Sequence, residues 1–376
     1  MKRAIIMTCF CTNGEIDAYK KRIIKSLKAY ANFFVVTLNG EVSLDSMQFL
    51  KKTVSKVLVR KNIGYDAGAY KDALLNLCME EYDELMLLND TFFGFFYPLD
   101  ELINRAKVES EVDFWGFTKH PKGKDDYNNI IEEHIQAYFL YIKSRMLHSN
   151  SFMEFWDNIS YPQTYNEAIH NFEIKFTVFF EKRGFIGRSF CDLEQAGIEI
   201  HYNENPYLLY PYELIRKMRC PILKRKSCSI NYPSTWKTIA YIEKMQLYDV
   251  DYLFKQILYD YKIGVISAYF NLYELEKFLK KYKKIYIFGK GKYGLSFYDY
   301  LTIRHIKVEK FVVSQNDNLD DKNIITLSEM PDGEKNGIIV ALKPKYKEEV
   351  IEELLRKVKV DQLFVGGKGI KEICNK

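Results

Sequence analysis

The sequence lacks any uninterrupted apolar run of the ~18 to 20 residues that a membrane helix needs, so a chain that crosses a bilayer is not expected. Cysteine is scarce and unpatterned, since the seven cysteines form no C-x-x-C pair and have no histidine at metal-binding spacing. Their odd number argues against a disulfide framework or a zinc site, and favours a reducing cytoplasm. Positive charge is also limited, because 55 basic and 50 acidic residues leave a net charge of +5. A nucleic-acid partner is therefore not expected.

Apolar residues are plentiful by contrast, at 47% of the chain, which rules out a disordered protein. The length of 376 residues suits two to three domains of roughly 150 residues each. The first apolar run, residues 4–11, has no small-residue cleavage site after it and is followed at once by an amphipathic helix. We therefore interpret this run as a buried strand and not as a signal peptide.

Strand and helix patterns alternate through the first part of the chain, with apolar residues at helical spacing over 15–31 and again over 64–81. Such βαβ alternation predicts an α/β fold with a mostly parallel sheet covered by helices. The expected strands are Ala4–Phe10, Phe33–Leu38, Val54–Arg60, Glu84–Leu88 and Asp113–Thr118.

The composition changes at residues 216–226, RKMRCPILKRK, where six basic residues occur. Helical patterns follow over 235–283, and a second α/β unit with a helix at 348–358 comes after them. We expect an N-terminal domain at 1–232, a helical linker at 233–280 and a small Rossmann-like domain at 281–376. The strands expected in this last domain are Lys284–Phe288, Lys307–Val313, Gly337–Leu342 and Gln362–Val365.

Two segments of the first domain are typical of a ligand site. The first runs from Arg60 through Gly64 and Gly68, where a strand leads through glycines into a helix whose N-terminal amides suit an anion. The second is the apolar strand that ends in Asn89-Asp90-Thr91, which delivers a carboxylate suited to a divalent cation. An ordinary βα turn and an Asx turn are the structural alternatives.

Together these segments resemble the rhamnan synthesis protein F family, over residues 1 to about 228. The matching stretches are RKNIGYDAGAYKDAL, LLNDTFFGFFYPL, DFWGFTKH, HIQAYFLYIK, ENPYLLYPYELI and CPILKRK. The resemblance implies a family 2-like glycosyltransferase of the GT-A fold. It implies transfer of a sugar, with rhamnose as the namesake, from a dTDP- or UDP-linked donor to a growing, lipid-linked cell-surface polysaccharide. Inversion of the anomeric carbon by single displacement is the implied mechanism.

The resemblance also implies roles for individual residues. Asp90 would bind Mg²⁺ or Mn²⁺, although Asn-Asp-Thr has one carboxylate fewer than the D-x-D of such enzymes, and His201 is the candidate second ligand. Glu173 is the candidate general base with Asp192 as the alternative, and an exposed acid at a helix start is the structural interpretation of Glu173. The donor-binding candidates are Thr12, Asn13, Arg60, Asn62, Gly64, Asp66, Asn89 and Asp90. The candidates for contact with the acceptor or sugar are Trp115, His134 and Gln136, of which the last two precede a further apolar strand.

In the last domain, Gly289, Gly291 and Gly294 form a G-x-G-x-x-G between a strand and a helix, which indicates a nucleotide site. Only Asp317 could take the ribose hydroxyl, so packing or homodimerisation is the alternative role. The basic residues of 216–226 are either a solvated face or a contact with anionic lipid, which would hold the enzyme peripherally on the inner face of the cell membrane. Two further functions stay open: a non-catalytic carbohydrate- or nucleotide-binding assembly factor, and a nicotinamide-dependent oxidoreductase.

Overall fold

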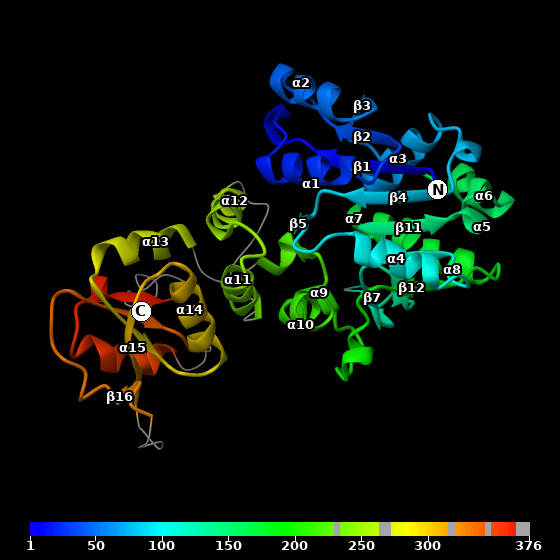
Figure 1. The fold of residues 1–376 in the computed structure, drawn as a ribbon. Coiled ribbons are helices and arrows are strands. Elements are labelled where there is room, and N and C mark those ends of the chain that lie inside the picture. The colour runs from blue at the N-terminus through cyan, green and yellow to red at the C-terminus, as the bar shows by residue number, and fades with distance from the viewer. Residues whose placement is uncertain (126, 229–233, 263–271, 315–320, 343–346, 366–376) are drawn as a thin grey trace. The chain divides into compact units, whose positions relative to one another are not determined.

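The computed structural model describes residues 1–125, 127–228, 234–262, 272–314, 321–342 and 347–365. They form two compact units, Met1–Lys224 and Arg225–Lys376 (Figure 1). The first unit holds a seven-stranded, mostly parallel sheet and the second a five-stranded parallel sheet. Both sheets confirm the predicted α/β class.

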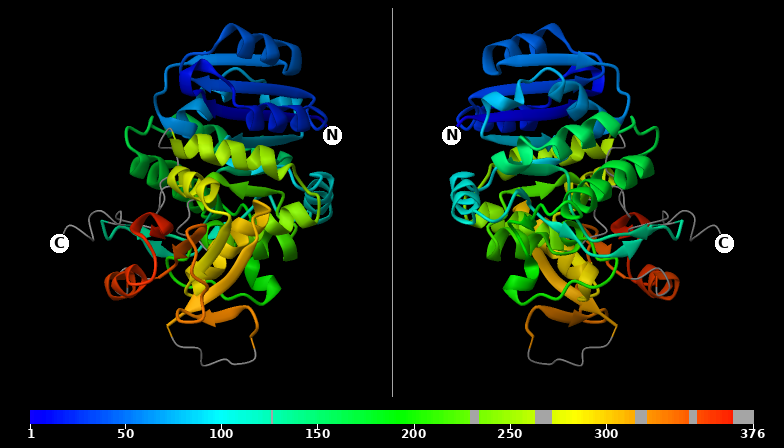
Figure 2. Two further views of the ribbon diagram at one scale, coloured as in Figure 1. Left: turned by 90° about the vertical axis from the view of Figure 1, so that its left-hand side faces the viewer. Right: turned by 90° about the vertical axis from the view of Figure 1, so that its right-hand side faces the viewer.

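The sheet of the first unit has the order β12-β6-β11-β4-β1-β2-β3. Strands β4, β1, β2 and β3 run parallel to one another, and the first three along the chain lie side by side in blue in Figure 2. Only β11 is antiparallel to its neighbours β4 and β6. The bounds are β1 Arg3–Phe10, β2 Phe33–Asn39, β3 Lys56–Arg60, β4 Glu84–Asn89, β6 Phe114–Gly116, β11 Phe139–Lys143 and β12 Gly187–Ser189.

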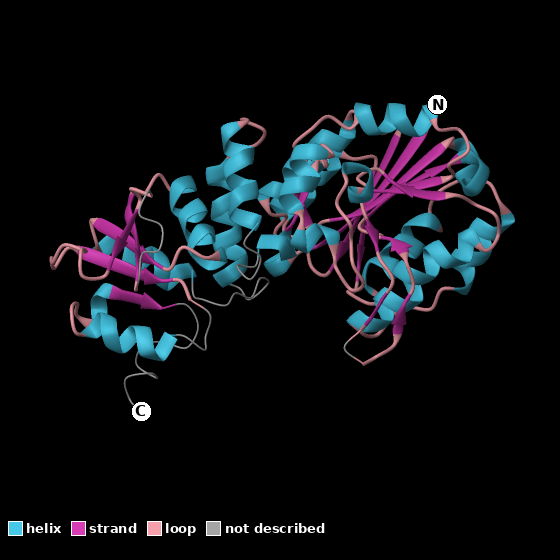
Figure 3. Ribbon diagram, turned by 90° about the horizontal axis from the view of Figure 1, so that it is seen from below, coloured by secondary structure: helices cyan, strands magenta, loops and turns pink. Residues whose placement is uncertain are grey.

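Helices line both faces of this sheet (Figure 3), which explains why β1, β2 and β4 are buried at nearly every position. Along β1, Ala4 and Ile6 pack into a large core on one face, while Ile5 and Met7 are buried on the other. The helix after β1 buries Tyr19, Ile23 and Leu27 at helical spacing. The helices are α1 Ala18–Lys28, α2 Leu44–Thr53, α3 Tyr65–Leu74, α4 Asp100–Val108, α5 Ser144–Leu147, α6 Asn150–Asn158, α7 Tyr165–Ala168, α8 Lys175–Glu181, α9 Pro206–Leu209 and α10 Pro211–Lys217.

Short structures surround the main sheet and supply side chains to the site described below. A π-helical turn, η3 at Ile169–Ile174, joins α7 to α8, and the 3-10 turn η1 at Thr12–Gly14 follows β1. Three two-stranded ladders lie outside the sheet. They pair β5 Phe92–Gly94 with β13 Ile222–Lys224, β7 Lys119–His120 with β10 His134–Ile135, and β8 Gly123–Lys124 with β9 Ile130–Ile131.

The second unit has the strand order β16-β15-β14-β17-β18, all parallel. Its core gathers apolar residues of the strands and of α15 around Val312, Ile338 and Leu354. The helices expected over 235–283 belong to this compact unit. The bounds are α11 Ser234–Lys244, α12 Val250–Lys262, α13 Leu272–Lys281, β14 Lys284–Phe288, α14 Lys292–Ile303, β15 Val308–Val313, β16 Ile324–Thr326, β17 Asn336–Val340, α15 Lys347–Leu355 and β18 Leu363–Val365.

Within the described residues, no helix combines the length and the apolar character that a bilayer span requires. The six cysteines in this part of the chain are all free thiols, and all but Cys78 are buried.

Candidate functional site

The polar residues expected to bind a ligand gather where the parallel strands end. Phe10, Asn39, Arg60 and Asn89 are the last residues of β1, β2, β3 and β4. Because these strands are parallel neighbours, their carboxyl ends meet at one edge, which is where open α/β sheets bind ligands.

Asn89, Thr91 and Asp66 form one hydrogen-bond network at this edge. Asn89 Nδ2 donates to Asp66 Oδ2 at 2.7 Å, so the amide links the end of β4 to the first turn of α3. Asn89 Oδ1 accepts from the Thr91 hydroxyl at 2.5 Å and from the Thr91 backbone N–H at 3.2 Å. The asparagine of Asn-Asp-Thr therefore positions the carboxylate of Asp66.

The pKa of Asp66 is raised to about 6, first because the group is buried, and further by the charges of Asp90 and Glu173. The hydrogen bond from Asn89 and the ammonium of Lys224 oppose this rise without cancelling it. Asp66 therefore changes charge near neutral pH, at the place where an anionic donor would bind.

We expect Asp66→Asn to change how the stability of the protein depends on pH. The folded state holds the proton of Asp66 up to about pH 6, whereas an ordinary aspartate loses it near 3.8. The wild-type free energy of unfolding therefore falls as pH rises through this window, by at most about 3 kcal/mol. The asparagine variant lacks this term, so its stability relative to wild type should increase between pH 4 and pH 7. Urea titrations across this range measure it, and parallel pH profiles for the two proteins would contradict the raised pKa.

Asp90 is engaged by a buried lysine. Its Oδ2 accepts from the backbone N–H of Phe10 at 3.0 Å and lies 3.0 Å from Nζ of Lys20, whose side chain is only 2% exposed. The same ammonium lies 2.7 Å from Asp17 Oδ2 and donates to the Phe10 carbonyl at 2.5 Å. The strand-end carboxylate thus holds the start of α1 against the end of β1.

This arrangement does not fit the divalent cation that the resemblance leads us to expect. Oδ2 of Asp90 already carries an ammonium and an N–H donor, and the neighbouring Asn89 amide is occupied by Asp66 and Thr91. The candidate second ligand, His201, is 64% exposed, and its ring lies 3.8 Å from Glu199. Throughout the described ranges, no three His, Cys, Asp or Glu side chains converge in a way that could hold a metal ion.

Glu173 is paired with His134. It lies in the π-helical turn η3, a geometry that is frequent at functional sites, and its Oε1 is 3.3 Å from His134 Nε2. His134 Nδ1 lies 2.7 Å from the Glu132 carbonyl, which can only accept, so Nδ1 carries a proton. The His120 ring stacks on His134 with centroids 5.3 Å apart. The histidine therefore fixes the direction in which Glu173 points.

The surroundings of Glu173 keep it ionised. Burial by itself raises the pKa of Glu173, but the hydrogen bond with His134 and the electrostatic interactions with His134, Lys224 and His120 outweigh burial, and the net pKa is lowered. The charge of Glu173 also contributes to the raised pKa of Asp66. A carboxylate that is ionised at neutral pH is able to accept a proton.

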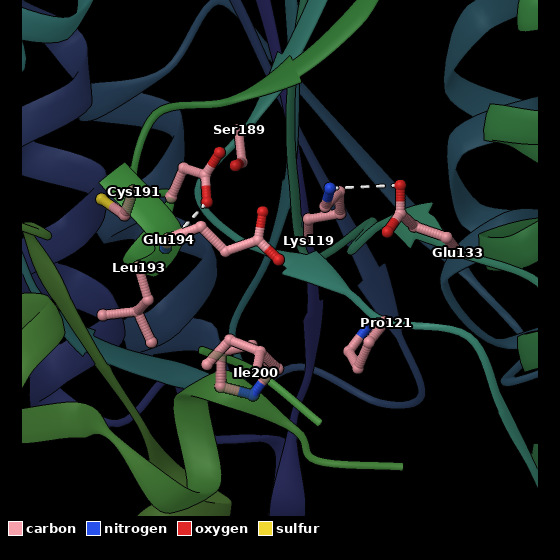
Figure 4. A pocket seen from close by; sticks show the side chains of 10 residues that line it. Lys119, Pro121, Glu133, Ser189, Cys191, Leu193, Glu194 and Ile200 are labelled. Atoms are coloured by element: carbon pink, nitrogen blue, oxygen red, sulfur yellow. Dashed lines mark hydrogen bonds and ion pairs between the residues drawn. The ribbon is translucent and has the colours of Figure 1, made fainter. Parts of the chain in front are cut away.

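A polar cavity of about 200 Å³ adjoins this pair. His134 lines it together with Lys119, Glu133, Glu181, Arg188 and Asp192. Figure 4 shows the smaller pocket beside it, where Lys119 Nζ lies 3.1 Å from Glu133 Oε1. Asp192, the alternative base, lines both pockets, and its carboxylate accepts from the Glu194 N–H at 3.1 Å. The structure therefore brings His134 and Asp192 to one cavity, and Glu173 contacts His134.

The segment that follows β3 uses its predicted ligand-binding residues for local structure. Arg60 donates to Asp72 at 2.6 Å, Asn39 at 2.6 Å and the Ile63 carbonyl at 2.7 Å. Gly64 has φ +77°, and a Cβ there or at Gly68 would come within 2.5 Å of the Tyr161 ring. Gly64 and Gly68 thus leave space for the ring of Tyr161. Donor contact through Arg60 and Gly64 stays a prediction, as it does for the exposed Asn62 and for Thr12 and Asn13 in η1.

Two of the acceptor candidates lie in the interior. Trp115 is completely buried and stacks on Phe190 with ring centroids 4.6 Å apart, so it belongs to the core and presents no face to a sugar. Gln136 is 2% exposed and accepts from the Thr118 hydroxyl at 2.6 Å. His134, by contrast, borders the polar cavity.

The basic residues of 216–226 do not share one surface. Lys224 is buried at 6% exposure, and Arg225 forms an ion pair with the buried Asp260 at 2.7 Å. Arg219 pairs with Glu101 at 2.6 Å on the surface. Contact with anionic lipid stays a prediction for the exposed residues of this run.

Two glycines of the G-x-G-x-x-G segment, Gly289 and Gly294, lie close together. Gly289 has φ +96°, and a Cβ on Gly294 would lie 1.9 Å from the Gly289 carbonyl oxygen, whereas a Cβ on Gly291 would meet nothing. Close approach of α14 to the end of β14 thus requires glycine at 294. Asp317 lies outside the described residues, and nucleotide binding by this loop stays a prediction.

We therefore expect Gly294→Ala to destabilise the second unit and Gly291→Ala to leave its stability close to wild type. The first substitution forces the helix away from the strand, at a cost of about 1–3 kcal/mol for overpacking. Thermal unfolding of the two variants makes the comparison. Equal melting temperatures would show that the close approach of Gly294 to Gly289 is not needed.

The sequence interpretation missed Lys20 and Lys224. Lys20 has a detectable signal, since it stands at helical spacing from Ile23 and Ile24 on the apolar face of α1. Lys224 has none, because the hydroxyl that it contacts belongs to Thr91, 133 positions away in the sequence.

Comparison with known proteins adds a family match. The model of the family described as Rhamnan synthesis protein F matches residues 34–290. The uncharacterized protein y4gN of Sinorhizobium fredii is 30% identical over 156 residues, which cover 40% of this chain and 39% of that protein. The chain thus spans less than half the length of this curated relative.

Solved structures show weak similarity. A cytidylyltransferase from Leptospira borgpetersenii is 13% identical with a TM-score of 0.30, over 50% of this chain and 75% of that one. Glucosyl-3-phosphoglycerate synthase from Mycobacterium tuberculosis, in complex with Mn²⁺, UDP and glucosyl-3-phosphoglycerate, is 14% identical with a TM-score of 0.24, over 31% and 44% of the two chains.

Proposed function

The chain belongs to the rhamnan synthesis protein F family, and we propose that its first unit is a glycosyltransferase that extends a cell-surface polysaccharide. The donor would be a sugar linked to UDP or dTDP, with rhamnose as the first candidate, and the acceptor a lipid-linked glycan. The observation that carries the proposal is the pairing of His134 with Glu173, a carboxylate whose pKa is lowered, in a chain that also gathers Asn89 and Asp66 at the carboxyl edge of the sheet.

In this proposal Glu173 is the general base of a single displacement. The oxygen of the acceptor hydroxyl bonds to the anomeric carbon of the donor sugar while the bond from that carbon to the phosphate oxygen breaks. The hydroxyl proton passes to the carboxylate of Glu173, and the nucleoside diphosphate leaves with the bonding electrons. His134 keeps the carboxylate oriented and lowers its pKa, so the base is ionised when the acceptor arrives.

The donor would lie against the end of β4, where Asn89 and Asp66 offer hydrogen-bonding groups to the sugar and nucleotide. The acceptor would enter the polar cavity that His134 lines, since sugar hydroxyls pair well with its charged walls. The side chains at Asp90 do not fit a divalent metal ion, so the proposed displacement uses only groups of this chain.

The test is release of nucleoside diphosphate from UDP-, dTDP- and GDP-linked sugars, measured with and without the lipid-linked precursor. Turnover that depends on the precursor would support the transferase and identify the donor. Binding of a donor or glycan without any turnover would instead support the second candidate, a non-catalytic assembly factor. The engagement of Asp90 by Lys20 favours that candidate, because it leaves the strand-end carboxylate without a metal to hold.

A further inference from the structure

Lys224 reaches the candidate site from a distant part of the sequence. It is the last residue of β13, which pairs antiparallel with β5 so that Lys224 lies opposite Phe92. This register puts its ammonium directly on the hydroxyl of Thr91, next to Asp90 in sequence. The ladder between β5 and β13 therefore delivers a positive charge to the end of β4.

The ammonium of Lys224 is buried among aromatic rings, unlike that of a surface lysine. The residue is 6% exposed, and its Nζ lies 4.1 Å from the ring centroid of Tyr138 and 5.3 Å from that of Tyr207. Aromatic faces stabilise an ammonium most when it is removed from water. Two rings and a hydroxyl thus fix the charge in place at the site edge.

The hydrogen bonds from Lys224 run in one direction across the site. The ammonium donates to the Thr91 hydroxyl, the hydroxyl donates to Asn89 Oδ1, and Asn89 Nδ2 donates to Asp66 Oδ2. Each acceptor in this series is polarised by the positive charge at its start. The three residues at the end of β4 therefore connect a buried cation to a buried carboxylate.

A departing nucleoside diphosphate needs positive charge close to its phosphates. At this edge of the sheet Asp90 pairs with Lys20, which is held by Asp17 and the Phe10 carbonyl as well. The donor set of Asn-Asp-Thr does not fit a divalent ion, so the charge has to come from a side chain. Lys224 is the ammonium that sits on Thr91.

We infer that Lys224 is the cation of the donor site, and that its ammonium binds the diphosphate of the donor in the place where a divalent metal ion would be expected. The inference rests on the proposed transferase function. It makes Lys224 a specificity-determining residue for nucleoside diphosphates, and it makes binding of the donor independent of added metal.

Isothermal titration of UDP, dTDP and GDP tests this inference in the full chain, with EDTA and, separately, with Mn²⁺. Wild type should bind at least one of the three in EDTA, with little change in Kd on adding Mn²⁺. Lys224→Met should weaken that binding on the order of 10- to 100-fold, the worth of a charge-assisted hydrogen bond. Lys224→Arg should retain most of it. Lys182→Met is the matched control, because Lys182 is exposed at the end of α8, and its affinity should equal that of wild type.

The outcomes separate the inference from the function on which it rests. Wild-type binding that appears only with Mn²⁺ overturns the inference but leaves the transferase standing, and so does a folded Lys224→Met variant with wild-type affinity. Failure of wild type to bind any of the three nucleotides under both conditions overturns both. If Lys224→Met does not fold, the wild-type titration in EDTA and the arginine variant decide the question.

Discussion

Glu173→Gln is expected to lower kcat of glycosyl transfer by about 10²- to 10⁴-fold while leaving the affinity for the donor close to wild type. Glutamine keeps the shape of the side chain and a hydrogen-bonding oxygen for His134, but it cannot take the proton of the acceptor hydroxyl. Steady-state kinetics with saturating donor, together with donor titration, separate the two effects. Glu154→Gln is the control, because that glutamate is a surface residue paired with Arg183.

The same variant series also tests the role of His134. The hydrogen bond and charge of this histidine lower the pKa of Glu173, so removing them should raise it. His134→Gln is therefore expected to shift the acidic limb of the pH profile for kcat/KM to higher pH, as a positioning role requires. A Glu173→Gln enzyme with normal turnover would move the assignment to Asp192, which borders the polar cavity that His134 lines.

Lys20→Met is expected to destabilise the first unit by about 3–5 kcal/mol, the range for removing one partner of a buried ion pair. The substitution leaves the carboxylates of Asp90 and Asp17 without their shared ammonium, and both lie largely out of water. Urea titration measures the loss. Lys25→Met serves as the control, since Lys25 is exposed on the same helix and should change stability by no more than about 0.5 kcal/mol.

A double variant checks the cause. Adding Asp90→Asn to Lys20→Met removes one of the two unpaired charges. The double variant should therefore be more stable than Lys20→Met alone. Additive losses would show that Asp90 and Lys20 do not depend on each other. Such a result would also weaken the argument against a metal ion at Asp90, because the Asp90 carboxylate would be available to another cation.

Sequence patterns alone predicted the α/β class and most of the parallel strands, but not the order of the strands in either sheet. Apolar runs bounded by turns predicted β1 to β4, and the alternation with helices predicted a parallel sheet, because only a strand buried on both faces is apolar at every position. The Gly289-x-Gly291 segment likewise followed from a local pattern of strand, glycines and helix. Local patterns are sufficient here, since secondary structure depends on residues that are near in the chain.

The site was decided by tertiary structure. Asn89-Asp90-Thr91 could be found in the sequence, but not that Asp90 pairs with Lys20, that Asn89 holds Asp66, or that Lys224 contacts Thr91. The sequence allowed Trp115 either to stack on a sugar or to pack in the core, and the structure stacks its ring on Phe190 in the core. These pairings join residues up to 133 positions apart. They depend on which strands become neighbours, and no spacing along the chain encodes that choice.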